Sequence, residues 1–299
     1  MGYRPSGRWR VSPLWLMFIL TGAHASAADQ PSVTLQRQGG WCVAESANFR
    51  CWVCADGEAA RELALTCESW RRRLHEQWGL PSVGTWLPRC EVIVHPHQTA
   101  YATALNRPGD SSVGSTRMQF DGERIVLRRI DLRRDAADWQ GSALPHELTH
   151  VVIAERFAGR PLPPWADEGL AMLSESSAKQ QVRLNSLHQT LRHGPCYSVR
   201  DLMAVRRLPP VEWRDAFYGQ SFALTAWLVD RNGPEAFLRF LEACQHQPLD
   251  EALRGHLAVE GVAGLEQEWE SWVRSPRSSN LADLWRWRPS VELAANVAE

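Results

Sequence analysis

The segment His146-Glu147-Leu148-Thr149-His150 combines residue types that can hold a metal and activate water. Histidines four residues apart lie one turn apart on the same face of an α-helix, so both imidazoles can reach one metal ion. Glu147 is rotated away from the two histidines by one position. It can therefore act on a water as a general base instead of binding the metal. The spacing predicts a zinc site with His146 and His150 as ligands.

The residues around this motif favour a helix. Pro145 is tolerated only in the first turn of a helix, which places the start near Ser142, and Gly159 with Pro161 ends the element. An apolar face recurs through the motif at Leu144, Leu148, Val151 and Val152. The motif is therefore expected on a helix that packs one face against the rest of the protein.

A catalytic zinc ion needs a third protein ligand. The metzincin pattern would place glycine and then histidine downstream of His150, but Ile153 and Arg156 occupy those positions and exclude that class. Glu168, eighteen residues after His150, stands early in a short helix that two prolines and a tryptophan open. Glu168 is the candidate third ligand, and the adjacent Asp167 remains open as an alternative. A carboxylate partner for either imidazole cannot be identified from the spacing, since the positions one turn beyond Glu168 are Ala171 and Met172.

The run His146–Met172 resembles the gluzincin metallopeptidases of the peptidase MA-like group, in which the H-E-x-x-H helix is followed by a glutamate on the next helix. The resemblance implies an α+β fold with a mixed sheet packed on that helix, a zinc cofactor, and peptide or protein substrates. The segment Phe217–Leu224 is similar to a Tyr-x-x-Ser-like segment that opens a helix in these proteins. This second similarity implies that the Tyr218 phenol hydrogen-bonds the oxyanion.

The elements before the motif are predicted from hydrophobic periodicity and turn residues. Residues 32–54 alternate like strands, 59–78 follow a helical period, and 90–94 form a buried strand. Residues 97–116 fit either helix or loop. A hairpin is predicted with strands at Met118–Phe120 and Arg124–Leu127 around an Asp-Gly turn, and the chain is mostly helical from Ser142 onward.

The start of the chain has the layout of a secretory signal peptide. A basic segment, a short apolar run and an Ala-x-Ala site at Ala25 and Ala27 follow one another. We therefore expect export to the periplasm or outside the cell, with no stable membrane insertion after cleavage. The predicted organisation is a signal peptide at 1–27, an N-terminal α/β region at 28–110, a gluzincin-like catalytic domain at 111–274 and a C-terminal tail at 275–299.

Export makes disulfides possible for the seven cysteines. Cys51 and Cys54 form a C-x-x-C, but on a strand these positions point to opposite faces, which argues against a shared metal or redox site. The pairs expected instead are Cys67 with Cys90 and Cys196 with Cys244. Their connectivity is not fixed by the sequence.

The formal net charge of −1 gives no field that would favour nucleic acid or an anionic membrane. The sequence thus predicts an exported zinc metallohydrolase that cleaves peptide bonds with Glu147 as base, and the resemblance implies Tyr218 at the oxyanion. The alternative is a catalytically inactive protein that keeps the gluzincin fold as a binding module. The intact Glu147 favours the enzyme.

Overall fold

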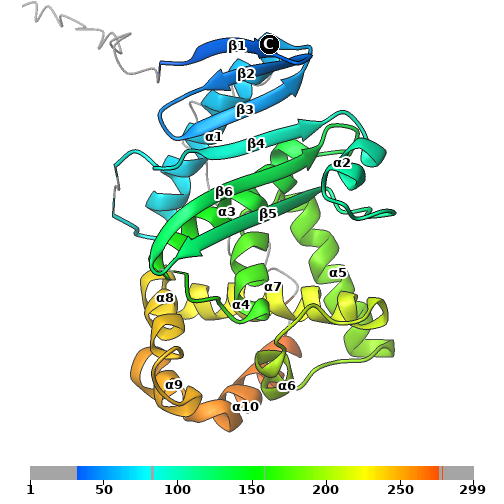
Figure 1. Cartoon of the computed structure of the whole chain (residues 1–299). Coiled ribbons are helices and arrows are strands. Elements are labelled where there is room, and N and C mark those ends of the chain that lie inside the picture. Colours follow the sequence, from blue (N-terminus) through cyan, green and yellow to red (C-terminus); the bar gives the residue numbers. More distant parts are fainter. Residues whose placement is uncertain (1–31, 82–83, 158, 276–277, 279–299) are drawn as a thin grey trace, which may run out of the picture. The chain divides into compact units, whose positions relative to one another are not determined.

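The computed structural model describes residues 32–81, 84–157, 159–275 and 278. The predicted signal peptide lies outside the described residues, as does the predicted tail except for Ser275 and Ser278. Within the described ranges, a mixed sheet is followed by a long helical part (Figure 1). The α+β class predicted from the sequence is confirmed.

Six strands form one sheet in the order β1-β2-β3-β4-β6-β5. The central pairs β3–β4 and β4–β6 are parallel, and the other three pairs are antiparallel. The sheet joins strands from before and after residue 110, and β5 lies at its edge. The strand bounds are β1 Thr34–Gln38, β2 Trp41–Glu45, β3 Phe49–Cys54, β4 Cys90–His95, β5 Gly114–Asp121 and β6 Arg124–Arg133.

The helices form one layer against the sheet and a second group beyond it (Figure 1). Among the described residues, no helix has both the length and the apolar character that a membrane span requires. The helix bounds are α1 Gly57–Gln77, α2 Gln98–Ala104, α3 Leu144–Arg156, α4 Pro164–Met172, α5 Ser177–His193, α6 Val199–Ala204, α7 Arg214–Asn232, α8 Pro234–Ala243, α9 Leu249–Leu257 and α10 Gly261–Val273.

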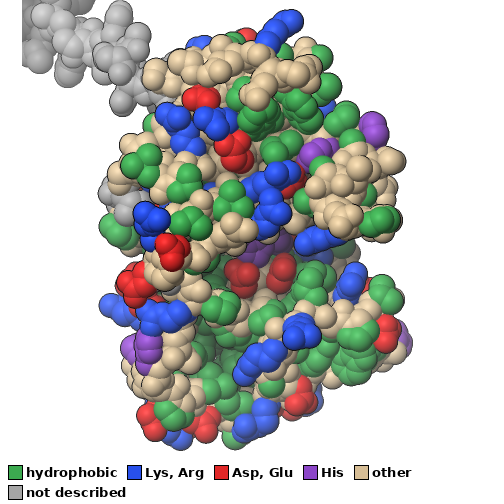
Figure 2. Space-filling model, viewed as in Figure 1, with side chains coloured by type: hydrophobic (Ala, Val, Ile, Leu, Met, Phe, Trp, Pro, Cys, Tyr) green, Lys and Arg blue, Asp and Glu red, His purple; other side chains and the backbone are tan. Residues whose placement is uncertain are grey.

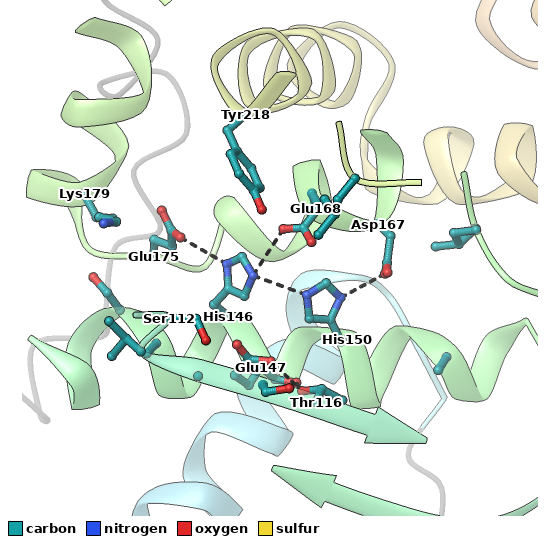
Figure 3. Close-up of a pocket in the computed structure, with 18 of the residues that line it drawn as sticks. Ser112, Thr116, His146, Glu147, His150, Asp167, Glu168, Glu175, Lys179 and Tyr218 are labelled. Carbon is teal, nitrogen blue, oxygen red and sulfur yellow. Dashed lines mark hydrogen bonds and ion pairs between the residues drawn. The ribbon is translucent and has the colours of Figure 1, made fainter. Parts of the chain in front are cut away.

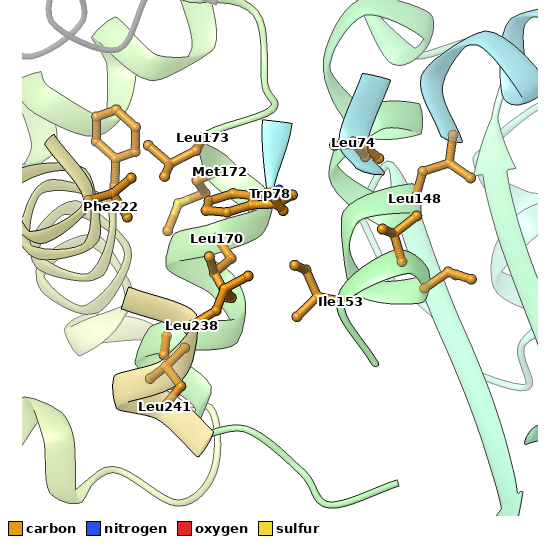
Figure 4. Packing of buried hydrophobic residues seen from close by; sticks show 14 of the residues in the cluster. Leu74, Trp78, Leu148, Ile153, Leu170, Met172, Leu173, Phe222, Leu238 and Leu241 are labelled. Carbon is orange, nitrogen blue, oxygen red and sulfur yellow. The ribbon is translucent and has the colours of Figure 1, made fainter. Parts of the chain in front are cut away.

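The helix that carries the H-E-x-x-H motif, α3, lies between the sheet and the helical part. It contacts β5, β6, α1 and α4. Buried side chains from both sides form one hydrophobic cluster, in which Leu148 of α3 lies near Leu74 of α1 (Figure 4). A buried ion pair adds to this, since Arg128 Nη2 of β6 donates to Glu155 Oε1 at 2.7 Å. These contacts fix α3 in position, which fixes the motif.

Several sequence predictions are sharpened by the structure. Residues 97–116, which fitted helix or loop, contain α2 and the start of β5. The predicted hairpin is present, but its strands are longer because β5 begins at Gly114 and β6 extends to Arg133. The helix predicted to start near Ser142 starts at Leu144, after a π-helical turn at Trp139–Ala143.

The predicted disulfides are wrong, because all seven cysteines are free thiols. Cys67 of α1 is buried against Cys51, not bonded to Cys90. Burial raises the pKa of both the Cys67 and the Cys90 thiols well above the ordinary value, which keeps them protonated and unreactive. The opposite orientation of Cys51, which is buried, and Cys54, which is exposed, is confirmed.

Candidate metal centre

The two histidines of the motif are presented by the first two turns of α3. Pro145 occupies the second position of the helix, where its missing N–H has no intrahelical partner to lose. One turn later the Thr149 hydroxyl contacts the Pro145 carbonyl oxygen at 2.8 Å and Ser174 Oγ at 2.9 Å. These contacts tie the start of α3 to the segment that follows α4, and so align the two helices that carry the candidate ligands.

Three of the predicted ligand residues converge on one point. Among the described residues, His146, His150 and Glu168 form the one group whose ligand atoms all lie within 4.8 Å of one another. The two Nε2 atoms are 3.3 Å apart, and His146 Nε2 lies 3.5 Å from Glu168 Oε2 (Figure 3). All three side chains are partly buried. The structure therefore brings together the residues that the sequence singled out, from α3 and α4.

The distances can be compared with those of a tetrahedral metal site. Metal–nitrogen bonds of about 2.0–2.1 Å at tetrahedral angles separate two ligand atoms by roughly 3.3 Å. The separations of 3.3 and 3.5 Å match this value. Two Nε2 lone pairs facing each other at this distance repel unless a cation lies between them. The donor set and its spacing fit a zinc-type ion.

Outer carboxylates hold the other ring nitrogens of both histidines. Nδ1–H of His150 donates to Asp167 Oδ1 at 3.0 Å, and His146 Nδ1 lies 3.1 Å from Glu175 Oε1. Such contacts fix the ring orientation and leave Nε2 for the metal. Geometry favours Glu168 over Asp167 as the third ligand. Asp167 faces Nδ1 of His150, whereas Glu168 faces the converging Nε2 atoms (Figure 3).

The carboxylate partners of the imidazoles, which the spacing does not identify, are Asp167 and Glu175. Asp167, predicted as an alternative ligand or a solvated helix-start residue, is instead the partner of His150. Glu175 lies beyond the end of α4 at Met172, in a turn, so helical spacing from Glu168 does not reach it. The one signal in the sequence is its acidic side chain seven residues after Glu168.

The carboxylates shape the electrostatics of the site. Burial disfavours the charged form of His146, but its contacts with Glu168 and Glu175 outweigh this and raise its pKa well above the ordinary value. Burial opposes the charge of His150 as well, and Asp167 overcomes it and raises the pKa of His150 to about 9. The site is thus built to stabilise positive charge, whether a proton or a metal ion supplies it.

Glu147 is positioned by the edge strand β5. Its side chain is 7% exposed, and Thr116 Oγ1 donates to Glu147 Oε2 at 2.7 Å. Gly114 makes this approach possible, since a Cβ there would lie 2.6 Å from Glu147 Oε1. Neither strand residue was predicted as part of the site, because pairing across the fold cannot be read from local spacing.

Tyr218 lies on α7 with its hydroxyl directed toward Glu168 and His146 (Figure 3). Burial and the Glu168 charge raise the pKa of Tyr218 to about 12, so the phenol is protonated at neutral pH. Its ring is covered by the Arg183 guanidinium, 5.0 Å from the ring centre. Arg183 also donates to both oxygens of Glu175, at 3.0 and 3.3 Å. One arginine therefore links the partner of His146 to Tyr218.

The position of Glu168 depends on close packing between α4 and α7. Gly169 faces α7, where an added Cβ would overlap Thr225 Oγ1 and lie 2.9 Å from the Ser221 carbonyl oxygen. Any side chain there would push α4 away from α7. Glu168 is the preceding residue, so this contact sets how far its carboxylate reaches toward the histidines.

These residues open onto a cleft of about 1320 Å³. One wall is β5, and the opposite wall includes residues of α5 and α7. In the space-filling view, acidic and histidine side chains gather in the hollow between the sheet and the helical part (Figure 2). The cleft is large enough for several residues of an extended chain.

The fold and the site together define an α+β protein with an H-E-x-x-H helix and a third acidic residue on the next helix. The family model of the Peptidase MA superfamily matches residues 118–275, which is more than half of the chain. The chain belongs to the peptidase MA superfamily, as the resemblance at His146–Met172 indicated. Peptidases of this superfamily are metal-dependent, which suggests a metallopeptidase-like function. Comparison with curated proteins gives no match.

Proposed function

We propose that the protein is an exported zinc-dependent metallopeptidase of the gluzincin type. The convergence of His146, His150 and Glu168 carries this proposal. The contacts of α3 with β5 and β6 support the gluzincin arrangement, in which the sheet packs on the H-E-x-x-H helix. When bound by these three side chains, zinc would supply Lewis-acid polarisation of a carbonyl group and of a water.

Glu147 takes the proton from the attacking water in this proposal. Thr116 occupies Oε2 of Glu147, so the carboxylate cannot rotate freely and Oε1 remains to accept a proton. A base held in one orientation within a water-poor site is favourable for proton transfer. Glu147 then passes the proton to the leaving amine, which completes peptide-bond hydrolysis.

Tyr218 stabilises the oxyanion that develops during attack. With its pKa raised to about 12, the phenol keeps its proton at neutral pH and can donate a hydrogen bond. The contact with Arg183 limits where the ring can lie. Tyr218 is thus a directed donor on the side of the cleft opposite Glu147.

The substrate is proposed to be a peptide or protein segment in extended form. Within the described residues, β5 pairs only with β6, and several of its residues line the cleft. An unpaired strand edge has backbone groups that can pair with an added strand. Such pairing would lay the scissile bond across the site between Glu147 and Tyr218.

Hydrolysis and metal content test the proposal together. Purified wild-type protein is expected to hold about one zinc per chain and to cleave peptides. The Glu147→Gln variant is expected to keep the zinc while its hydrolysis falls roughly 10²–10⁴-fold. A Glu147→Gln variant that holds zinc and keeps full activity would contradict the role of Glu147 as base. A wild-type protein that binds no zinc would contradict the proposed metal centre.

Export is part of the proposal and is tested separately. Mass spectrometry of the protein recovered from the exported fraction is expected to show an N-terminus directly after Ala27, as the Ala-x-Ala site predicts. Retention of the full chain in the cytoplasm would contradict export and would leave the metal centre unaffected.

A further inference from the structure

One rim of the cleft carries three cations. Lys179 and Arg183 are four residues apart on α5, and Arg214 is four residues before Tyr218 on α7. All three line the cleft, and the spacing of four places each pair on one side of its helix. We name Lys179, Arg183 and Arg214 the cationic lip.

Two cations of the lip have no acidic partner among the described residues. Lys179 and Arg214 are exposed, and no ion pair involves either of them in that part of the chain. The nearest polar contact of Arg214 is weak, from Nε to the Pro209 carbonyl oxygen at 3.3 Å. Arg183 differs, because its charge is already paired with Glu175.

Of the carboxylates that line the cleft, Glu175 pairs with Arg183 of the lip, and within the described residues none forms an ion pair with Lys179 or Arg214. Each has a contact elsewhere in the protein, with a cation, a histidine or a hydroxyl group; these carboxylates are Asp110, Asp138, Glu147, Asp167, Glu168 and Glu175. Lys179 and Arg214 therefore remain available to pair with an anionic group of a substrate in the cleft.

The other end of the cleft has a different character. Phe120, Phe157 and Leu162 line it. The cation at that end, Arg160, has Nη1 2.6 Å from His246 Nε2. The cation Lys179 thus lies near the start of β5, and aromatic and aliphatic side chains line the cleft near its end. In the close-up, Lys179 and Ser112 lie at the end of the site where β5 begins (Figure 3).

The direction of a bound peptide follows from strand geometry. An antiparallel ladder is slightly more stable per residue than a parallel one. A peptide antiparallel to β5 has its N-terminal part near Asp121 and its C-terminal part near Gly114. Its residues after the scissile bond would then lie beside the cationic lip.

We infer that the cationic lip is an anion-binding subsite, which takes an acidic side chain or the terminal carboxylate on the C-terminal side of the scissile bond. The inference rests on the proposed peptidase function. Lys179 and Arg214 make the contact, whereas Arg183 remains paired with Glu175. The protein is thus a peptidase that prefers substrates with an anionic group just after the cleaved bond.

Matched peptides test the subsite in the zinc-loaded protein. A series that is identical except for Glu, Gln or Lys after the scissile bond is expected to give kcat/KM about three- to tenfold higher for Glu than for Gln, and lowest for Lys. Peptides with free and amidated C-termini separate a terminal carboxylate from a side chain. Moving Glu to the N-terminal side of the bond is expected to abolish the preference.

Charge reversal at Lys179 provides the sharpest variant. Lys179→Glu is expected to invert the preference from Glu to Lys. Adding Arg214→Ala is expected to remove the remaining attraction for the acidic peptide. The fold tolerates the change, because Ser176 caps α5 by accepting from the Lys179 N–H and glutamate is favoured at that position. Arg192→Glu, exposed on the last turn of the same helix, is the control and is expected to leave the preference unchanged.

A second measurement does not depend on catalysis. Lys179 is the only lysine in the sequence, so an amine-acetylating reagent reports on this residue in the peptide that contains it. In the Glu147→Gln variant, an acidic peptide is expected to slow acetylation of Lys179, and a neutral peptide of the same length is not. The protection should weaken as salt is added, because exposed charges are screened.

The outcomes separate the inference from the proposed function. If no peptide is hydrolysed by the zinc-loaded protein, the proposed function fails. If neutral peptides are hydrolysed but acidic ones are no better, the inference fails alone. It fails equally if Lys179→Glu keeps the wild-type preference, or if the acid is preferred on the N-terminal side of the bond.

Discussion

Two histidine–carboxylate clusters among the described residues can be compared, and one of them converges on a possible ion site. In the sheet, His95 Nε2 lies 2.8 Å from Asp131 Oδ1, and Arg129 makes two hydrogen bonds of 2.7 Å to the same carboxylate. His95 and Asp131 are 5% and 2% exposed. This cluster joins β4 to β6, and its charges neutralise each other.

On α3, the carboxylates contact Nδ1 of both histidines instead. Each Nε2 atom is then directed toward the other ring and toward Glu168. Within the described part of the chain no arginine pairs with Glu168, so the positive charge that stabilises it comes from the histidines or from a metal. In His95 the carboxylate contacts Nε2, and the histidine stabilises the sheet. In His146 and His150 the carboxylate contacts Nδ1, which leaves Nε2 free to bind a metal.

The largest expected effect comes from removing one histidine from each cluster. His146→Ala is expected to abolish zinc binding and hydrolysis, because two ligands do not hold the ion. His95→Ala is expected to keep about one zinc per chain but to lower the free energy of unfolding by about 1–3 kcal/mol, since Asp131 loses a buried partner. Elemental analysis after gel filtration and urea denaturation measure the two effects. Equal loss of zinc in both variants would contradict the assignment of metal binding to His146 and of a structural role to His95.

The outer carboxylates are expected to differ in the same way. Glu175→Gln should weaken zinc affinity about 10- to 100-fold, because it removes the charge that orients His146. Asp131→Asn should leave the affinity unchanged. Competition against a chelating dye measures both affinities, and an unchanged affinity in Glu175→Gln would mean that the contact with His146 is incidental.

The packing beneath Glu168 can be tested with a pair of glycines. Gly169→Ala is expected to destabilise the protein by about 1–3 kcal/mol, because the new methyl group meets Thr225 and the backbone of Ser221. Gly255→Ala, on α9 in open space, is expected to stabilise it by about 0.4–1 kcal/mol. Thermal unfolding of both variants separates them, and equal stability would contradict the close contact of α4 with α7.

The smallest expected effect is a pH dependence of the metal-free protein. Asp167 raises the pKa of His150 from 6.5 to about 9, so the ion pair stabilises the fold fully below pH 6.5 and is lost as the pH rises through about 9. Water screens Asp167, whose side chain is 43% exposed, so the loss is about 1 kcal/mol. Urea denaturation between pH 6 and 9 measures it. Asp167→Asn should flatten the profile, and an unchanged slope would exclude this pair as its cause.

The sequence predicts the parts of the site that follow helical spacing. His146 and His150 share a face because they are four residues apart, and Glu168 lies on the next helix, which begins at Pro164. The strands and the hairpin are predicted for the same local reason, since alternation and an Asp-Gly turn need no knowledge of the rest of the fold.

The remaining parts depend on contacts between distant segments. Thr116 and Gly114 reach Glu147 only because β5 lies beside α3, and Glu175 reaches His146 from a turn after α4. The thiol of Cys67 lies against Cys51 because α1 packs on β3. The number and the spacing of the cysteines in the sequence do not reveal this packing. Local pattern therefore predicts the ligands but not the residues that hold them.

The most direct test of the metal centre is anomalous diffraction at the zinc absorption edge from crystals of the zinc-loaded protein. We expect one peak about 2.0–2.2 Å from Nε2 of His146, Nε2 of His150 and a carboxylate oxygen of Glu168. Zinc bound through Asp167, or through Nδ1 of either histidine, would contradict it, as would the absence of a peak at this site.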